Sequence, residues 1–325
     1  MKIGIVTLNP GIDRLMYLAS PLTAGSMNRA ARTVTNQGCK GANQSLMFGK
    51  LGDEVEYFSF TGGIGAAFME DIVQKAGVHA HFVPTGAGVR MNIKVIDAAG
   101  ACTEINERGG PIKSAEWERL KTEIFAPFHN DIQYDTHCDR YDMLSLCGSI
   151  PQGVEKSVYN SLIREARAHK IPTALDCDGE ALALGIQAEP ALIKPNVREL
   201  ASLLGESEER LRQRKFLVEA CGKIRAHYDT EVLCTLDADG SLFVGNDGVF
   251  HIPPVNVPLR GFSGAGDTYL AAFLHARYSE KLPTGEALRF GAAAASAKVA
   301  LEGTRVPDRA QTEQMLPRVL VEKIG

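Results

Sequence analysis

Residues 141–176 read YDMLSLCGSIPQGVEKSVYNSLIREARAHKIPTALD, and this stretch decides the fold. Its first part, Tyr141–Leu146, is an apolar run that predicts a strand. Lys156–Ala168 places apolar residues at helical spacing, and Pro172–Leu175 predicts a second strand that ends at Asp176. A strand, a helix and a strand in this order favour a β-α-β unit with parallel strands.

The same alternation continues on both sides of this stretch. Because such repeats build a doubly wound sheet, we expect an α/β fold with a mostly parallel sheet flanked by helices, in a single domain over residues 1–325. Ligands bind such sheets outside the carboxyl ends of the strands. The further expected strands are Glu54–Phe60, Ala191–Ile193, Glu231–Leu236 and Val249–Ile252, and the further expected helices are Ala66–Ala76, Ser114–Phe128, Glu208–His227, Asp267–Tyr278 and Glu286–Leu301.

Two stretches break the alternation, at about residues 13–35 and 89–107. The strand-like runs in them are Asp13–Leu18, Ala30–Thr35, Val89–Ile96 and Cys102–Glu107, with no helix between partners. We therefore expect a small inserted β-sheet that is separate from the main sheet. A lid over the strand ends is a natural role for such a sheet.

The composition is that of an ordinary globular protein, and it excludes several classes of function. The chain has 325 residues, of which 45% are hydrophobic, and 35 Lys and Arg stand against 39 Asp and Glu. Without a dense basic block, this balance argues against binding to nucleic acid or to a membrane surface. No apolar run reaches the length of a membrane span. The seven cysteines are dispersed without a C-x-x-C pair, which is typical of a reduced, cytoplasmic protein.

The strongest local motif is Gly264-Ala265-Gly266-Asp267, directly before an expected helix. Small residues let consecutive backbone N–H groups face one point, and the start of a helix adds partial positive charge. The motif therefore indicates a cradle for a phosphate, at whose edge the Asp267 carboxylate could accept a proton from a hydroxyl group. A glycine-rich helix start capped by an aspartate is an equally good interpretation of the motif alone.

Three weaker motifs each have a structural and a functional interpretation. Gln37–Asn43 combines glycines with a lysine at a helix start, either as a plain loop or as a site whose asparagine binds a sugar hydroxyl. Asn196 and Glu199 share a helix face, so they could support Mg²⁺ through water molecules or form a capping box. Arg90 and Asn92 share a strand face, which is either exposed or clamps a substrate phosphate.

Together, the order and spacing of these motifs resemble the ribokinase-like (PfkB) carbohydrate kinases over nearly the whole chain. Within that family they are most similar to the branch that contains 1-phosphofructokinase and tagatose-6-phosphate kinase. The motifs that carry the resemblance are Thr7–Asp13 (T-L-N-P-G-I-D), Asn28–Ala30, Gln37–Asn43, Gly62-Gly63, Arg90-x-Asn92, Gly148–Gly153 (G-S-I-P-Q-G), Lys194–Leu200 (K-P-N-x-x-E-L), Gly264–Asp267 (G-A-G-D) and Gly303-Thr304.

The resemblance implies a ribokinase-like fold and Mg²⁺-dependent transfer of the ATP γ-phosphoryl group to a hydroxyl of a ketohexose phosphate. That substrate would be fructose 1-phosphate, tagatose 6-phosphate or fructose 6-phosphate. Asp267 is the expected catalytic base, and Gly264, Ala265 and Gly266 would stabilise charge on the transferred group. The expected substrate-binding residues are Asp13, Arg29, Gly38, Lys40, Asn43, Arg90 and Asn92, the expected ATP-binding residues are Lys194, Thr235, Asp237, Gly240 and Ser263, and the expected supports of Mg²⁺, through water, are Asn196 and Glu199.

The resemblance also assigns the cations at the sugar end. Lys40 and Arg90 would bind the substrate's own phosphate. Arg29 could assist from a partner subunit, because small lid sheets with exposed edges often pair into homodimers.

Three positions depart from the family's pattern: Cys39 where glycine is usual, Asp237 near the expected nucleotide phosphates, and Phe262 before the cradle. They leave open a catalytically weakened sensor of the same fold that binds a sugar phosphate or a nucleotide. A further alternative is a ribokinase or nucleoside-type kinase that acts on an unphosphorylated substrate. Lys40 and Arg90 disfavour that alternative, because two cations suit an anionic substrate.

Overall fold

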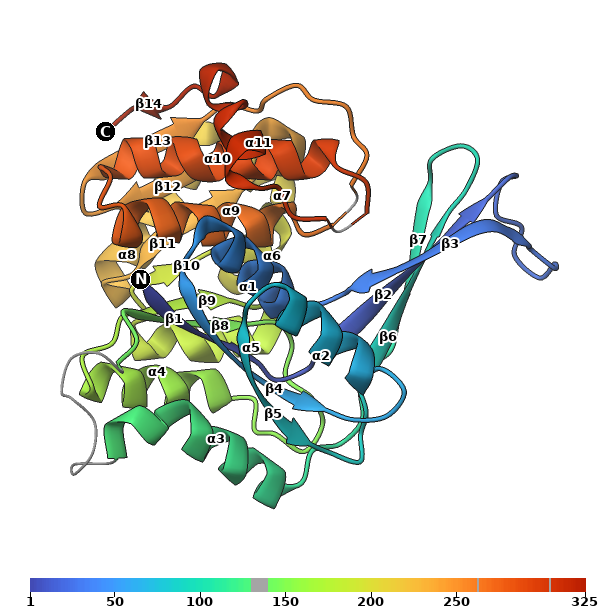
Figure 1. The fold of residues 1–325 in the computed structure, drawn as a ribbon. Helices are drawn as coiled ribbons and strands as arrows, with labels where there is room; N and C mark the ends of the chain where they lie inside the picture. Colours follow the sequence, from blue (N-terminus) through green and yellow to red (C-terminus); the bar gives the residue numbers. More distant parts are fainter. Residues whose placement is uncertain (130–139, 262, 304) are drawn as a thin grey trace.

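The computed structural model describes residues 1–129, 140–261, 263–303 and 305–325, so Phe262 and Thr304 lie outside the described residues. Within these ranges, ten strands form one sheet in the order β14-β13-β12-β11-β10-β9-β8-β1-β4-β5 (Figure 1). The strands from β11 to β5 pair in parallel. β12, β13 and β14 add antiparallel strands at one edge. The strands are β1 (Lys2–Thr7), β4 (Glu54–Thr61), β5 (His79–Pro84), β8 (Met143–Cys147), β9 (Thr173–Asp176), β10 (Leu192–Ile193), β11 (Glu231–Thr235), β12 (Ser241–Gly245), β13 (Gly248–Ile252) and β14 (Glu322–Lys323).

Helices cover both faces of this sheet. One apolar core contains residues of α3, α4, α6 and α8, and the other contains residues of α1, α9 and α10. The helices are α1 (Lys40–Leu51), α2 (Ala66–Lys75), α3 (Ser114–His129), α4 (Val158–Ala168), α5 (Gly179–Gly185), α6 (Val197–Leu204), α7 (Glu208–Leu211), α8 (Arg214–Tyr228), α9 (Ala265–Leu274), α10 (Thr284–Ala300) and α11 (Arg309–Glu313). This layering confirms the expected doubly wound, mostly parallel α/β fold.

The alternation of side chains along the central strand β1 explains the two cores. Ile3 and Ile5 point into the core with α1, α9 and α10, whereas Val6 and Leu8 belong to the core on the opposite face. All four side chains are fully buried. A strand that is buried on both faces is apolar along its whole length, as strands of parallel sheets are.

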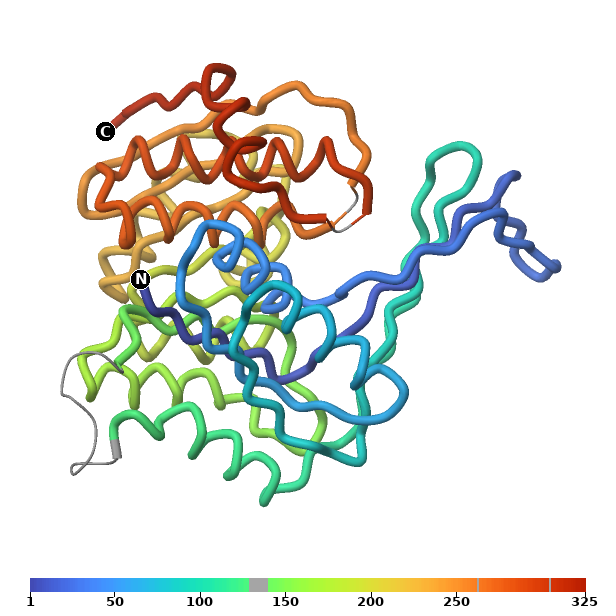
Figure 2. Tube along the Cα trace, in the orientation of Figure 1, coloured from blue at the N-terminus to red at the C-terminus, as the bar shows by residue number. Residues whose placement is uncertain are grey.

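A second, four-stranded sheet extends away from this body (Figure 2). Its strand order is β3-β2-β6-β7, with β2 (Gly11–Leu18), β3 (Ala30–Gln37), β6 (Arg90–Ile96) and β7 (Cys102–Asn106). β2 pairs in parallel with β6, while β3 and β7 are the antiparallel edge strands. We call it the small sheet, and it confirms the separate sheet expected from the two stretches without helices.

Two expected helices differ in the structure. Glu208–His227 is divided into α7 and α8, and Arg212 at the break donates hydrogen bonds to Asp237 and Asp239. The expected helix Asp267–Tyr278 is α9 followed by a π-helical turn, His275–Ser279. The sequence pattern also did not predict α5 and β14, which are short.

Candidate active site

The candidate site lies where neighbouring parallel strands end at their carboxyl side. Asp176 is the last residue of β9, Lys194 directly follows β10, and Thr235 is the last residue of β11. The first turns of α1 and α9 bring Lys40 and Asp267 to the same place. Sheet order therefore gathers residues that are far apart in the sequence.

The start of α9 forms a cradle for an anion. Gly264 is the N-cap residue and has a φ of +84°, in the left-handed region that favours glycine. The N–H groups of the first turn, Ala265, Gly266 and Asp267, have no acceptor within the helix. A Cβ atom at Gly266 would lie 3.3 Å from the Lys194 ammonium nitrogen. The N–H groups at the start of α9 and the Lys194 ammonium thus lie close together, as the binding of a phosphate requires.

The Asp267 carboxylate lies in this first turn and is almost fully buried. Its Oδ2 accepts a hydrogen bond of 2.7 Å from Asn43 Nδ2. Burial and the negative charge of Asp176 raise the pKa of Asp267 to about 6, against the opposing effects of Lys40 and Lys194. A carboxylate with this pKa is a better proton acceptor at neutral pH than an ordinary one.

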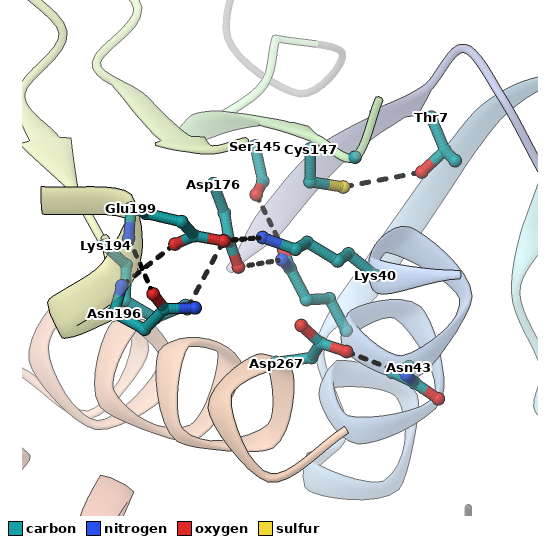
Figure 3. Close-up of polar contacts among 12 residues, drawn as sticks. Thr7, Lys40, Asn43, Ser145, Cys147, Asp176, Lys194, Asn196, Glu199 and Asp267 are labelled. Atoms are coloured by element: carbon teal, nitrogen blue, oxygen red, sulfur yellow. Dashed lines mark hydrogen bonds and ion pairs between the residues drawn. The ribbon is translucent and has the colours of Figure 1, made fainter. Parts of the chain in front are cut away.

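The carboxylate of Asp176 connects the other charged groups of the site (Figure 3). It is fully buried, and its Oδ1 lies 2.7 Å from Lys40 Nζ and 3.3 Å from Lys194 Nζ. Gln44 Nε2 approaches its other oxygen at 3.5 Å. Burial alone would raise the pKa of Asp176, but the two lysines outweigh that effect and lower the pKa. One ionised carboxylate therefore serves as the counter-charge of two ammonium groups.

Lys40, which was expected to bind the substrate phosphate together with Arg90, is paired with carboxylates in the structure. Its ammonium contacts Asp176 and also Glu199, whose Oε1 is 3.3 Å away. Burial would lower the pKa of Lys40, but Asp176, Glu199 and Asp267 raise it well above its usual value. Because Lys40 is the first residue of α1, it reaches the strand ends, where these carboxylates hold it. Lys40 thus has carboxylate partners, whereas Arg90 donates to backbone carbonyl oxygens, and their common role at a substrate phosphate stays a prediction.

Asn196 and Glu199 form the capping box that starts α6. Asn196 Oδ1 accepts a hydrogen bond from Glu199 N at 2.8 Å, and Glu199 Oε2 accepts one from Asn196 N at 2.9 Å. Residues 1–129, 140–261, 263–303 and 305–325 contain no group of three His, Cys, Asp or Glu side chains that could hold a metal. The side-chain oxygens of Asn196 and Glu199 accept hydrogen bonds from backbone N–H groups and from Lys40, and their support of Mg²⁺ through water stays a prediction.

The expected sugar-binding residues meet where the small sheet joins the body. Asn92 Nδ2 donates to Asp13 Oδ1 at 3.0 Å and to Gly38 O at 3.1 Å. Gly38 is required there, because a Cβ atom would overlap the Asp13 carboxylate and backbone. Lys94, which the motifs did not single out, lies 2.7 Å from Asp13 Oδ2, and both side chains are buried. Ser263 Oγ, from a residue expected near ATP, donates to the same oxygen at 3.5 Å.

The two expected arginines lie at different distances from this cluster. Arg90 pairs with Gly11 in the register of the small sheet, and its guanidinium donates to Asn9 O and Glu107 O. Arg29 is exposed and precedes β3, at the end of the small sheet remote from Asp13. Asp13 pairs with Asn36 near the other end of β3, so the length of this strand separates Arg29 from Asp13 by about 20 Å. Arg29 therefore lies far from the site of its own subunit.

The expected nucleotide-binding segment follows β11. Thr235 N donates to Pro195 O at 3.0 Å, which places this strand end beside Asn196. Asp237 has a φ of +54°, and its carboxylate lies 3.2 Å from Arg212 Nη2. Gly240 is required, because a Cβ atom would overlap the Ile252 carbonyl. Arg212 thus pairs with Asp237 and also with Asp239, so it offsets part of the negative charge that these two carboxylates place beside the expected nucleotide site.

Cys39 is accommodated without strain. It is the N-cap residue of α1 with a φ of −133°, an extended conformation open to any residue. Its thiol is buried 3.6 Å from the Tyr57 hydroxyl, and burial raises the pKa of the thiol. The position therefore does not require the glycine that the family usually has.

Three functional candidates escaped the motif analysis: Asp176, Lys94 and Lys298. Asp176 was recognised as the end of a strand, but no motif of neighbouring residues indicated a role for it. Lys298 stands alone in the alanine-rich stretch of α10, and its buried Nζ donates to Gly303 O at 2.7 Å. In the sequence, the only sign of a special role for this residue was a single lysine within an alanine-rich stretch.

The comparisons with known proteins agree with this geometry. The model of the pfkB family of carbohydrate kinases matches residues 6–311. The chain is 33% identical over 303 residues to 1-phosphofructokinase of Haloferax volcanii, covering 93% of this chain and 92% of that protein. It is 26% identical over 318 residues to 1-phosphofructokinase of Escherichia coli strain K12, covering 98% and 97%.

Solved structures show the same fold. Phosphofructokinase-2 from Escherichia coli in complex with substrates and products superposes with a TM-score of 0.86 at 24% identity, covering 98% of this chain and 99% of that one. Ribokinase from Thermotoga maritima superposes with a TM-score of 0.73 at 20% identity, covering 97% and 99%.

The chain belongs to the pfkB family of carbohydrate kinases. It is an ATP-dependent sugar-phosphate kinase, which transfers a phosphoryl group to a hydroxyl group and uses ATP with Mg²⁺. Among the described residues, the structure has no helix with the length and apolar character needed to cross a bilayer.

We expect Asp176→Asn to lower the free energy of unfolding by about 3 kcal/mol at pH 7, because the buried Lys194 ammonium loses its counter-charge and Lys40 keeps only Glu199. Urea denaturation measures this. The pKa of Asp176 is lowered by folding, so its stabilisation is complete above the unfolded pKa of about 4 and is lost as the pH falls. The difference from wild type should therefore shrink at acidic pH. Asp178→Asn, at an exposed carboxylate nearby, is the control. Equal effects of the two substitutions would contradict the assignment.

Proposed function

We propose that the protein is a cytoplasmic enzyme that transfers the γ-phosphoryl group of ATP to a hydroxyl group of a ketohexose phosphate, with Asp267 as the base. The position of Asp267 carries this proposal. Its carboxylate lies in the first turn of α9, at the edge of the anion cradle. Asn43 ties it to α1, which directly follows the small sheet that carries Asp13. The base thus lies between the sugar end and the phosphate end.

The surrounding residues suit the demands of phosphoryl transfer, in which positioning and charge stabilisation dominate. Asp13, Asn92 and Gly38 offer hydrogen-bonding groups to sugar hydroxyls, and Asn43 orients the base. Lys194, Lys40 and the N–H groups of the cradle stabilise the negative charge of the transferred group. Thr235 and Gly240 line the nucleotide side. Mg²⁺ would neutralise phosphate oxygens beside Asn196 and Glu199.

Fructose 1-phosphate is the substrate that we favour, because the relatives at 33% and 26% identity carry the name 1-phosphofructokinase. A coupled assay of ADP formation with fructose 1-phosphate, fructose 6-phosphate, tagatose 6-phosphate, ribose and a nucleoside tests this. We expect the highest kcat/KM with fructose 1-phosphate. A preference for ribose or the nucleoside would refute a sugar phosphate as substrate, and a preference for another ketohexose phosphate would refute only the choice among the three.

Two structural findings bear on the alternatives. The relaxed backbone at Cys39 removes one of the reasons for proposing a weakened sensor, and the pairing of Asp237 with Arg212, which Asp239 shares, weakens a second. The argument against an unphosphorylated substrate changes, because Lys40 is held by carboxylates. The cations near the sugar end are Arg90 and Lys94, and Lys94 is paired with Asp13. The preference for a phosphorylated sugar therefore rests mainly on Arg90.

We expect Asp267→Asn to lower kcat by about 10²- to 10⁴-fold while the sugar still binds, because the amide cannot accept the hydroxyl proton. In the wild type, kcat/KM should fall as the pH drops below about 6, where Asp267 becomes protonated. Steady-state kinetics at several pH values between about 5 and 8 measure both effects, because this range spans the titration of Asp267. Near-normal turnover in the variant, or a persistent acidic limb in its residual activity, would exclude Asp267 as the base.

We further propose a homodimer that forms through the small sheet. Its edge strand β7 is exposed along its whole length, and the sheet region exposes apolar side chains at Met27 (77%) and Ile105 (60%). Exposed edges and apolar side chains of this kind favour pairing with a second copy. A tetrameric form of phosphofructokinase-2 from Escherichia coli is known. In a dimer of this type, the remote Arg29 would reach the partner's sugar site.

Mixing two impaired variants tests the contribution of Arg29 across subunits. Arg29→Ala should raise the KM for the sugar phosphate, and Asp267→Asn should be nearly inactive. After the two are refolded together, about a quarter of the sites should combine an intact base with an intact partner arginine and regain wild-type KM. Asp176→Asn mixed with Asp267→Asn is the control, since both changes affect one subunit's site. Kinetics of the mixture that equal the average of the two separate variants would contradict the proposal.

A further inference from the structure

A buried ammonium group lies behind the phosphate cradle and has no role in the scheme above. Lys298 stands in the last turn of α10, and its relative exposure is 1%. Burying a charged group without water is costly unless the surrounding protein replaces its hydration. A lysine in this position therefore calls for a physical explanation.

Backbone carbonyl groups take the place of water around Lys298. Its Nζ donates a hydrogen bond of 2.7 Å to Gly303 O. A Cβ atom at Gly261 would lie 2.8 Å from Lys298 Nζ, 2.7 Å from Leu301 O and 3.0 Å from Gly303 O. The ammonium and two carbonyl oxygens thus converge beside Gly261. No carboxylate in the described part of the chain forms an ion pair with Lys298.

The same side chain lies against the loop that leads into the cradle. A Cβ atom at Gly264, the N-cap residue of α9, would lie 3.5 Å from Lys298 Cε. Gly261 N donates to Val299 O at 3.0 Å, which ties the loop to the end of α10. Lys298 therefore lies between the turn 301–303 and the two glycines Gly261 and Gly264.

Charged groups at both ends of the site affect the pKa of Lys298. Burial lowers its pKa to about 8, the negative charge of Asp267 acts in the opposite direction, and Lys94 acts in the same direction as burial. The group is therefore protonated at neutral pH. It adds a fixed positive charge close to the place where the scheme above puts the transferred phosphoryl group.

We propose that Lys298 is a positioning residue whose ammonium acts as a tethered cation, which holds Gly261 and Gly264 against the turn 301–303 and thereby orients the N–H groups at the start of α9. A free monovalent cation at this place would need the same carbonyl oxygens, and the lysine supplies that charge from within the chain. The inference rests on the proposed role of the cradle in phosphoryl transfer. The inference implies that the wild-type enzyme needs no ammonium or methylammonium salt for its activity.

Lys298→Met is the first test, because methionine keeps the length of the side chain and removes its charge. We expect kcat to fall by about 10²-fold, as for the loss of an oxyanion-stabilising donor, while the KM for the sugar changes by less than about twofold. Lys50→Met is the matched control. Lys50 Nζ also donates to a backbone carbonyl, Val306 O at 2.6 Å, but Lys50 lies at the opposite end of α1 from Lys40. We expect its kinetics to match those of the wild type.

Chemical rescue of Lys298→Ala is the second test, since it separates a tethered charge from simple packing. The shortened side chain leaves space lined by carbonyl oxygens, which methylammonium fits. We expect methylammonium chloride to raise kcat of this variant by about tenfold, whereas tetramethylammonium chloride at equal ionic strength has no effect. The wild type should respond to neither salt.

The outcomes separate this inference from the proposed function. Unchanged kcat in Lys298→Met overturns the inference, and so does a loss of kcat in Lys298→Ala that methylammonium does not restore. If Lys298→Ala is unfolded, as circular dichroism would show, methylammonium must restore both the fold and the activity. Full activity of Asp267→Asn in the same assay would instead refute the proposed function.

Discussion

The carboxylate of Asp176, buried at the end of β9, is the group on which the rest of the site depends. It is the shared counter-charge of Lys40 from α1 and Lys194 from the segment after β10. Glu199 also contacts Lys40, so the two ammonium groups face two carboxylates, and the N–H groups at the start of α9 add the donors that an anion needs. The same carboxylate raises the pKa of Asp267 by repulsion. One buried charge thus organises the phosphate end and also tunes the proposed base.

Much of the fold could be predicted from the sequence, because helical and strand periodicity are local properties of the chain. The β-α-β alternation and the four strands of the small sheet were recognised on this basis. The cradle residues Gly264–Asp267 and the pair of Asn196 with Glu199 also lie where their motifs suggested. The direction of Lys40, the pairing of Asp13 with Lys94 and the position of Ser263 could not be derived, since each depends on which distant segments meet. Asp237 could be judged only after Arg212 was placed beside it.

The site concentrates charged groups that a more stable protein would avoid. Asp13 with Lys94, Asp176 with Lys194, and Lys298 are all buried. Apolar residues of similar volume often stabilise a fold more than buried ion pairs do. The location of these charges around one end of the sheet is therefore better explained by the need to bind and move a highly charged group than by stability.

Two of the connections between the small sheet and the body are very short. Only residues 38 and 39 separate the end of β3 from the start of α1, and only residues 8–10 separate β1 from β2. A tilt of the small sheet must therefore turn the first residues of α1, which include Lys40 and Asn43. Under the proposed roles of Asp13 and Lys194, such a movement would couple sugar binding to nucleotide binding, and each ligand would change the affinity for the other by the same factor.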